Sequence, residues 1–360
     1  MSNEKTTAQA QHALIMGGKF VGEFPKTTHP EAQWFYHPVT LGLFIHWGIS
    51  AAGDDLDISW GMMDNPARYG RNGMTTPRKY WQLAEKFNPQ NYNPEKWLTA
   101  AKDAGFTYAV LTTRHHDGFS LWPSDVSDFS TKNYMGGRDL VQEYVDACRK
   151  VGLKVGFYYS PPDWRFNQKY MSFAQGSRTE KFPDRAHKDI DHNVIDAIPE
   201  MPAEHKEKYI AYVNAQAREL LTRYGRIDLL WFDGTTNDLD HTITIDEIRS
   251  LQPHIIVNDR MWGFGNGDYC TKYECFLPTE KPPYEYWETC HCWHVGGGWS
   301  YVKNADKYRP LEDTLHKYDV CKEFGGNLLL NVAPDGDGNL PDAYYEKVKE
   351  FGLALKQKNK

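Results

Sequence analysis

Short apolar runs alternate with amphipathic segments along most of the chain. The clearest runs are rich in β-branched and aromatic residues and lie at residues 41–48, 108–116, 154–160, 227–234, 254–260 and 327–334. Nearly continuous apolar character over a short run is typical of strands that are covered on both faces, as in a parallel sheet. The pattern therefore predicts six buried strands of one parallel sheet.

Amphipathic helical segments fill the intervals between these runs. One begins at Thr76, with a proline at its first helical position, and another stops at Gly105. Segments 137–152 and 205–225 end in basic residues and a glycine, as helix C-termini do. Strand–helix alternation at this spacing predicts an α/β fold of the (β/α)8-like (TIM) barrel type, with some irregular strands.

The same pattern sets the expected domain organisation. An eight-stranded barrel requires two strands that the apolar pattern does not mark, and we expect them within residues 266–300. We expect residues 31–360 to form one catalytic barrel after an N-terminal extension at residues 1–30. Residues 166–205 are polar and lack periodicity, which predicts a long insertion that shapes the entrance of a site.

Polar or aromatic side chains stand at the end of every predicted strand. Taken alone, Asp233 is typical of a turn residue, because Gly234 follows it and Asp-Gly commonly ends a strand. In a (β/α)8 barrel, however, the active site lies at the C-terminal ends of the strands. The whole set of strand ends therefore favours a site over a turn: His46, Trp47, His115, His116, Asp117, Tyr158, Tyr159, Trp231, Asp233, Asn258, Asp259, Arg260 and Asn331.

Composition and charge narrow the classes of function. The net charge is −7 and the sequence pI is about 6.1, without a basic stripe, so we expect neither a nucleic acid nor a membrane as partner. The mean hydropathy is −0.68, and no apolar run is long enough for a transmembrane helix. The N-terminus lacks a secretory signal pattern, so we expect a cytoplasmic protein, or a periplasmic or secreted one if a signal peptide has been removed.

The polar strand ends indicate hydrolysis of a glycosidic bond. The chain has no glycine-rich phosphate loop and no serine on a strained elbow, and we expect no cofactor. Two carboxylates together with His, Arg and Tyr suit glycoside hydrolysis, which needs one protonated acid and one ionised nucleophile or base. Aromatic residues make up 14% of the chain, and flat rings of this kind stack against sugars.

At these residues the chain resembles the α-L-fucosidases of glycoside hydrolase family 29. The resemblance spans about residues 34–340, and its pieces are LGLFIHWG, RHHDGFSLW, VGFYYSPPDW, LLWFDG, NDRMWG, DYCTKYE, YWETC, WSY and NLLLNVAPDGDG. It implies a (β/α)8-like barrel and an exo-acting, retaining enzyme that removes terminal α-L-fucosyl residues from a fucosylated oligosaccharide or glycoconjugate. The oligomeric state stays open.

The resemblance also implies roles for individual residues. The nucleophile of the family falls on Asp233, and its sugar-binding histidines fall on His46, His115 and His116. Trp231 and Arg260 complete the pocket. Because side chains alternate along a strand, only one of Tyr158 and Tyr159 can face the centre, and we expect Tyr159 to do so.

The general acid/base has two candidates. Family members often carry it in a T-x-E pattern, whereas this chain reads Thr271-Lys272-Tyr273-Glu274, one residue longer. Glu288, in the WETC piece, is the alternative. We expect Glu274 to protonate the leaving oxygen and Glu288 to be a positioning residue.

Two departures from the family pattern stand out. Many members have a Glu-Trp pair after the first strand, whereas this chain has Ser59-Trp60, so Trp60 remains as a substrate-binding residue and the carboxylate is expected to be absent. The family also usually continues into a C-terminal β-sandwich, and this chain ends at Lys360 after a final helical segment. We therefore expect a barrel without that domain.

Three other interpretations compete with this one. Residues 290–294, CHCWH, offer metal ligands, but their spacing differs from that of structural zinc sites. His115 and His116 are adjacent, so alternation along a strand predicts that they point to opposite faces and share no ion. We therefore expect a metal-independent enzyme. The alternatives in function are an α-L-galactosidase and a non-catalytic sugar-binding relative.

Overall fold

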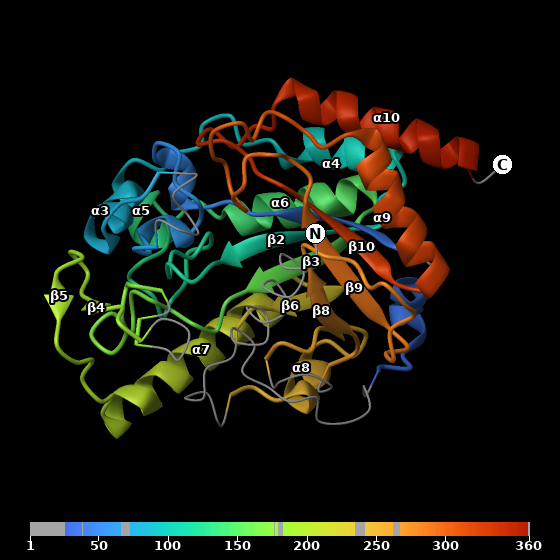
Figure 1. Ribbon diagram of the computed structural model, residues 1–360. Helices are drawn as coiled ribbons and strands as arrows, with labels where there is room; N and C mark the ends of the chain where they lie inside the picture. The colour runs from blue at the N-terminus through green and yellow to red at the C-terminus, as the bar shows by residue number, and fades with distance from the viewer. Residues whose placement is uncertain are drawn as a thin grey trace.

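The computed structural model describes residues 26–37, 39–65, 73–175, 177–178, 183–234, 242–261 and 267–358 (Figure 1). A curled sheet of parallel strands occupies the middle, and helices flank it. The strands of this sheet are β1 (Leu41–Ile45), β2 (Tyr108–Arg114), β3 (Lys154–Tyr159), β6 (Leu229–Phe232), β7 (Ile256–Val257), β8 (Cys270–Glu274), β9 (Trp287–Cys292) and β10 (Asn327–Val332).

The sheet has the strand number and direction of a (β/α)8 barrel. Its order is β7-β6-β3-β2-β1-β10-β9-β8, with parallel pairing throughout. The two strands that the apolar pattern does not mark are β8 and β9, inside the expected range 266–300. Between the outermost strands β7 and β8, the described residues show a single parallel bridge, which joins Asn258 to Tyr269. The predicted fold class, including its irregular strands, is confirmed.

Helices follow most strands, as the alternation of patterns predicts. They are α3 (Pro77–Trp81), α4 (Pro94–Asp103), α5 (Thr131–Tyr134), α6 (Leu140–Val151), α7 (Ala203–Arg223), α8 (Ile245–Leu251), α9 (Leu311–Phe324) and α10 (Asp342–Lys358). Short 3-10 turns are η1 (Pro30–Tyr36), η2 (Ile49–Ala52), η3 (Trp60–Met62) and η4 (Gln82–Glu85). Within the polar insertion, β4 (His187–Lys188) and β5 (Val194–Ile195) form a small antiparallel pair.

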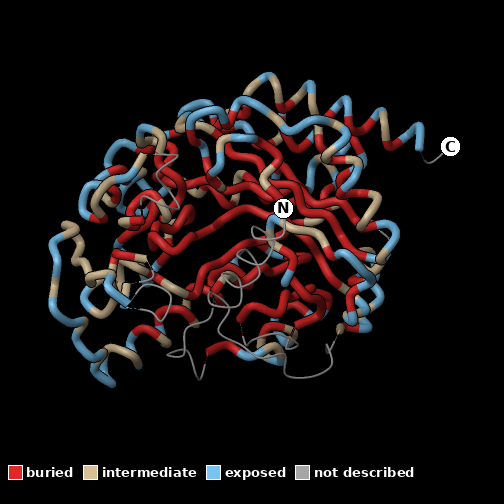
Figure 2. The backbone as a smooth tube through the Cα atoms, viewed as in Figure 1, coloured by how far each residue is buried: buried red, intermediate tan, exposed pale blue. Residues whose placement is uncertain are grey.

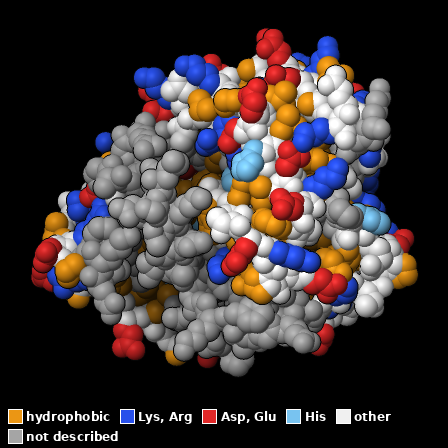
Figure 3. All heavy atoms as spheres, turned by 45° about the vertical axis from the view of Figure 1, so that its right-hand side comes forward, with side chains coloured by type: hydrophobic (Ala, Val, Ile, Leu, Met, Phe, Trp, Pro, Cys, Tyr) orange, Lys and Arg blue, Asp and Glu red, His pale blue; other side chains and the backbone are white. Residues whose placement is uncertain are grey.

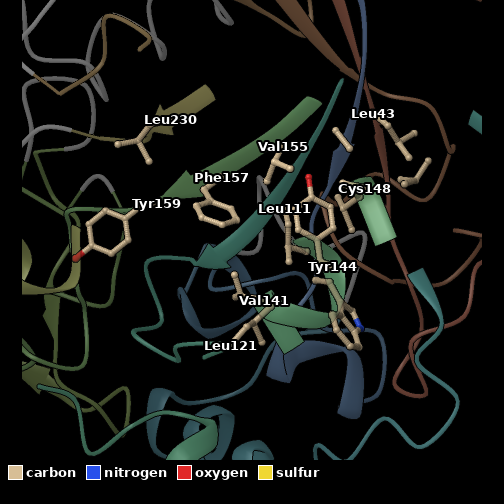
Figure 4. Packing of buried hydrophobic residues seen from close by; sticks show 14 of the residues in the cluster. Leu43, Leu111, Leu121, Val141, Tyr144, Cys148, Val155, Phe157, Tyr159 and Leu230 are labelled. Carbon is tan, nitrogen blue, oxygen red and sulfur yellow. The ribbon is translucent and has the colours of Figure 1, made fainter. Parts of the chain in front are cut away.

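The two faces of the sheet bury different sets of side chains. Val155, Phe157 and Tyr159 of β3 point to the outer face, where they pack with Leu111 and with Tyr144 of α6 (Figure 4). The residues between them point inward, so Tyr158 joins an inner cluster that includes Phe44, Val110, Leu229 and Trp231. Nearly the whole backbone of the sheet is buried (Figure 2). The barrel interior is thus a packed core that ends in polar groups at its C-terminal rim.

Charges of both signs are mixed on the face of the molecule that Figure 3 shows, where Lys and Arg side chains are interspersed with Asp and Glu. Across the described part of the chain, no helix combines the length and the apolar character that a bilayer-crossing helix needs.

Candidate active site

Two carboxylates flank one guanidinium at the C-terminal ends of the strands. Asp233 directly follows β6, and Glu274 is the last residue of β8. Nη1 of Arg260 lies 2.8 Å from Oδ1 of Asp233, and its Nη2 lies 2.8 Å from Oε2 of Glu274. The side chains of Asp233 and Glu274 are 15% and 24% exposed, whereas Arg260 is buried. A single buried cation therefore ties the two acidic groups together and leaves both accessible.

Arg260 is itself fixed by its surroundings. Its Nε donates to the hydroxyl of Thr271 at 3.0 Å, and its guanidinium carbon lies 4.3 Å from the ring centre of Trp231. Burial alone lowers the pKa of Arg260, but the carboxylates of Glu274 and Asp233 more than offset this and raise it above its ordinary value. The arginine stays charged and orients both acids.

Tyr158 binds the other oxygen of Asp233. Its hydroxyl donates to Oδ2 at 2.7 Å. Its ring stacks on His115 with 5.3 Å between ring centres, and on Trp231 with 5.6 Å. Burial, together with the charge of Asp233, raises the pKa of Tyr158 well above its usual value. The hydroxyl therefore keeps its proton and binds the oxygen of Asp233 that does not contact Arg260.

His46 presents a hydrogen-bond acceptor to the site. Its Nδ1 lies 2.6 Å from Oδ1 of Asn331, whose amide nitrogen donates to the carbonyl of Trp299. The oxygen of Asn331 therefore accepts, and Nδ1 of His46 carries the proton. Burial lowers the pKa of His46 to about 4, so the ring is neutral near pH 7. Within the described ranges only Nδ1 of His46 has a hydrogen-bond partner, so the unprotonated Nε2 can accept from a hydroxyl group.

His115 and His116 lie just beyond the end of β2. Nδ1 of His115 contacts the hydroxyl of Ser59 at 2.6 Å, and Nδ1 of His116 contacts the hydroxyl of Ser160 at 2.5 Å. Nε2 of His116 lies 3.5 Å from Oδ2 of Asp233. Burial lowers the pKa of both rings. These contacts fix both rings at the rim.

The remaining wall comes from two loops that meet above the barrel. Trp60 begins η3 in the loop after β1, and Trp299 lies in the loop after β9, with its ring centre 4.9 Å from that of His46. Asp57 joins the loops, because its Oδ1 accepts from the backbone N–H groups of Trp299 and Ser300. Together with the carboxylates and histidines, these side chains enclose a cavity of about 150 Å³.

A family model described as "Alpha-L-fucosidase" matches residues 9–360 of this chain. The chain belongs to the α-L-fucosidase family. It is therefore a glycoside hydrolase, and the resemblance of its sequence pieces to glycoside hydrolase family 29 is confirmed.

Individual relatives agree with this membership. α-L-Fucosidase isoenzyme 1 from Paenibacillus thiaminolyticus has a similar structure, with a TM-score of 0.72 and 32% identity, covering 91% of this chain and 75% of that one. The α-L-fucosidase of Dictyostelium discoideum is 26% identical over 349 residues, which cover 90% of this chain and 70% of the relative. A Thermotoga maritima α-fucosidase in complex with fucose has a TM-score of 0.66 and 27% identity, covering 91% of this chain and 74% of that chain.

In this α-L-fucosidase family member, all of the residues predicted to be catalytic or substrate-binding line the cavity, except Tyr159 and Glu288. They are His46, Trp60, His115, His116, Trp231, Asp233, Arg260 and Glu274. The fold brings these side chains together from the ends of β1, β2, β6, β7 and β8 and from the loop after β1. The strand-end residues Trp47, Asp117, Asn258, Asp259 and Asn331 do not line the cavity. Sequence reasoning missed Phe44, Asp57, Cys290, Gly297 and Trp299, which also line it. Trp299 had a signal, because it belongs to the WSY piece; Asp57 had none that sets it apart from Asp54 and Asp55.

The expectation that Tyr159 faces the centre is wrong. β3 pairs with β6 so that Tyr158 lies opposite Trp231 and Tyr159 opposite Phe232. Tyr158 therefore shares the inner face with Trp231. The hydroxyl of Tyr159 instead lies 3.2 Å from Oε1 of Gln216 in α7, on the outer face of the sheet.

Glu288 lies below the cavity and is 1% exposed. Its Oε1 accepts from the indole N–H of Trp231 at 3.0 Å, and its Oε2 accepts from the hydroxyl of Tyr108. Burial raises the pKa of Glu288 to about 7. Both oxygens are thus occupied inside the barrel, where no leaving group reaches them.

The expectation that His115 and His116 point to opposite faces is also wrong. β2 ends at Arg114, so alternation no longer applies, and the two ring centres are 4.2 Å apart. Ligand atoms of His115, His116 and Asp233 lie within 4.8 Å of one another. The charged guanidinium of Arg260 opposes a dication at this place. Over the described ranges, the candidates in 290–294 do not converge into a cluster of three ligands.

Proposed function

We propose that this protein is an exo-acting, retaining α-L-fucosidase in which Asp233 is the nucleophile and Glu274 the general acid/base. The observation that supports this most is the pair of carboxylates at the rim of the barrel, each of which contacts one of the two terminal nitrogens of Arg260. Retaining glycoside hydrolysis needs two such groups close together on either side of the scissile bond. The cavity of about 150 Å³ suits one sugar ring and not a longer chain, which favours removal of terminal residues.

The first step forms a covalent glycosyl-enzyme. A carboxylate oxygen of Asp233 attacks the anomeric carbon, while Glu274 gives its proton to the glycosidic oxygen as that bond breaks. Asp233 is the more enclosed of the two acids and is held by Arg260 and Tyr158, which suits an atom that must stay aligned with the sugar. Glu274 is the more exposed, which suits contact with a departing group.

The second step releases the sugar. Glu274, now ionised, takes a proton from water, and the water oxygen attacks the anomeric carbon as the bond to Asp233 breaks. Two inversions give net retention. Each carboxylate returns to its starting charge, and no cofactor enters the cycle.

The histidines and aromatic rings bind the sugar in this proposal. His46 is neutral and offers Nε2 as an acceptor, and His115 and His116 are fixed through their Nδ1 atoms. Trp60, Trp231 and Trp299 supply flat apolar surfaces for the non-polar faces and edges of the ring. The expected substrate is a fucosylated oligosaccharide or glycoconjugate. We also propose that residues 31–360 act as one catalytic barrel after an extension at residues 1–30, most of which lies outside the described residues.

The nucleophile is tested with Asp233→Gly on an aryl α-L-fucoside. The variant should lose several orders of magnitude in kcat, and azide should restore part of the turnover by producing a fucosyl azide of inverted configuration. Near-native activity of Asp233→Gly would refute the assignment. An aryl α-L-galactoside assayed in parallel on the wild type separates the two sugars, because a galactosidase would prefer it.

The acid/base is tested by varying the leaving group. Glu274→Ala should lose far more activity on fucosyl oligosaccharides than on activated aryl fucosides, because activated leaving groups need little protonation. Glu285→Ala is a control, since Glu285 is an exposed acid at the base of β9. Glu288→Ala should impair all substrates alike. If sensitivity to the leaving group follows Glu288 instead, the role of Glu274 in the proposal is wrong.

A further inference from the structure

Asp57 is a buried carboxylate in the cavity wall that the proposed chemistry does not use. It lies in the loop between η2 and η3 and is 3% exposed. Its Oδ1 accepts from the backbone N–H groups of Ile58, Trp299 and Ser300 at 2.9, 2.7 and 2.9 Å. Among the described residues, none donates to Oδ2, and no Lys, Arg or His forms an ion pair with Asp57. One oxygen is therefore saturated, the other has no donor among these residues, and Asp57 lines the cavity.

Such an arrangement costs stability unless a ligand uses it. A buried carboxylate without a cationic partner is unfavourable, because burial removes its hydration. Burial raises the pKa of Asp57 to about 6, while the hydrogen bonds from Ser300, Trp299 and Ile58 oppose this rise. The group is consequently ionised at neutral pH. A donor from a bound molecule would complete its hydrogen bonding.

The loops are shaped to bring Asp57 this close. A Cβ atom on Gly298 would lie 2.9 Å from Cγ of Asp57, so only glycine permits the approach. Trp299 is held through both of its backbone polar groups, because Asp57 accepts from its N–H and the amide of Asn331 donates to its carbonyl. Asn331 also accepts from His46. Asp57, Trp299 and His46 are therefore joined by one chain of hydrogen bonds in the cavity wall.

We propose that Asp57 is a specificity-determining residue whose Oδ2 accepts a hydrogen bond from a ring hydroxyl of the bound sugar. The proposal rests on the proposed function, because it takes that sugar to be the L-fucosyl group. A hydrogen bond from a neutral hydroxyl to a charged acceptor is charge-assisted, and its loss should lower kcat/KM by about 10- to 150-fold. The loss should be confined to substrates that carry the hydroxyl in question.

The test is a double-mutant cycle between enzyme and substrate. Wild type and Asp57→Asn are assayed on an aryl α-L-fucoside and on its 3-deoxy and 4-deoxy forms, with the 2-deoxy form as a third analogue. Asparagine retains an acceptor for the three backbone N–H groups, so the loops should keep their positions. We expect Asp57→Asn to lose about tenfold or more on the parent, and less than about threefold on one deoxy substrate.

A matched control variant distinguishes sugar binding by Asp57 from its contacts that join the loops after β1 and β9. Oδ1 of Asp55 accepts from the backbone N–H of Lys303 at 2.6 Å, so it joins the same two loops, but this contact is exposed. Asp55→Asn should change kcat/KM by less than about twofold on every substrate. Equal losses for Asp57→Asn on all substrates would assign Asp57 to loop positioning alone and overturn the proposal, as would a parent loss below about threefold. Failure of the wild type to hydrolyse any α-L-fucoside would instead refute the proposed function.

Discussion

The hydroxyl of Tyr158 should control the breakdown of the covalent intermediate. In the free enzyme it donates to Oδ2 of Asp233 at 2.7 Å. As the glycosyl-enzyme is hydrolysed, negative charge returns to Asp233, and this hydrogen bond stabilises the charge as it develops. During the first step the carboxylate loses charge, so the same bond gives no advantage there. Tyr158→Phe should therefore slow the second step selectively.

The magnitude follows from the type of bond. A hydrogen bond to a charged group contributes about 1.5–3 kcal/mol, which corresponds to about 10- to 150-fold in rate. On an aryl fucoside with a good leaving group, we expect the second step to limit turnover, because the first step then needs little protonation. We expect kcat of Tyr158→Phe to fall by that factor and KM to fall with it, so that kcat/KM changes little.

Rapid-mixing kinetics provide the assay. Because the intermediate accumulates, Tyr158→Phe should release a burst of the aryl alcohol that equals the enzyme concentration. Tyr159→Phe is the matched control, since its hydroxyl contacts Gln216 outside the barrel. That variant should keep kcat within about twofold and lose only about 1 kcal/mol of unfolding free energy. The reasoning is refuted if Tyr158→Phe leaves kcat unchanged, or if Tyr159→Phe lowers kcat by the same factor as Tyr158→Phe.

Three further predictions follow from the same geometry. Exhaustive dialysis against EDTA should leave full activity, because Arg260 disfavours a dication beside Asp233; a loss of activity that Zn²⁺ restores would contradict this. Burial raises the pKa of Glu288 from 4.5 to about 7, so its contribution to stability is present below pH 4.5 and is lost as the pH rises to about 7. Relative to Glu288→Gln, the wild type should therefore lose about 3 kcal/mol of unfolding free energy over that interval in urea titrations, and parallel curves would contradict the shift. Gly42→Ala would place a Cβ atom 2.2 Å from the ring of Tyr108. The unfolding free energy of this variant should therefore fall by about 1–3 kcal/mol. An unchanged denaturation midpoint would contradict this and show that the barrel interior rearranges to accept the methyl group.

Local pattern was enough to locate most of the site. An apolar run needs only its own side chains to become a buried strand, and its polar terminal residue then lies at the rim of the sheet. For this reason His46, Asp233 and Arg260 were found from the sequence, and the family pieces around them pointed to the same place. The strands β8 and β9 were harder to find, because polar and cysteine residues interrupt their apolar character.

The sequence does not show how far below the rim of the barrel a residue on a strand lies. Glu274 and Glu288 both lie on strands, and a small polar residue or cysteine follows each of them in the sequence. Glu274 ends β8 and reaches the cavity, whereas Glu288 lies near the start of β9 and is enclosed by Tyr108 and Trp231. Only the position of each residue along its strand, relative to the rim, separates an accessible acid from a buried one.

What the sequence by itself determined was the parallel α/β barrel, the family and the strand ends that carry chemistry, because each depends on residues that are neighbours in the chain. Tertiary structure alone decided that Tyr158 and not Tyr159 faces Trp231, because that choice follows from the register of β3 on β6. It also decided that Asp57 enters the cavity wall, because its carboxylate is held there by amides of Trp299 and Ser300, far away in the sequence. Strand register and the meeting of distant loops depend on packing across the whole domain, which no local pattern contains.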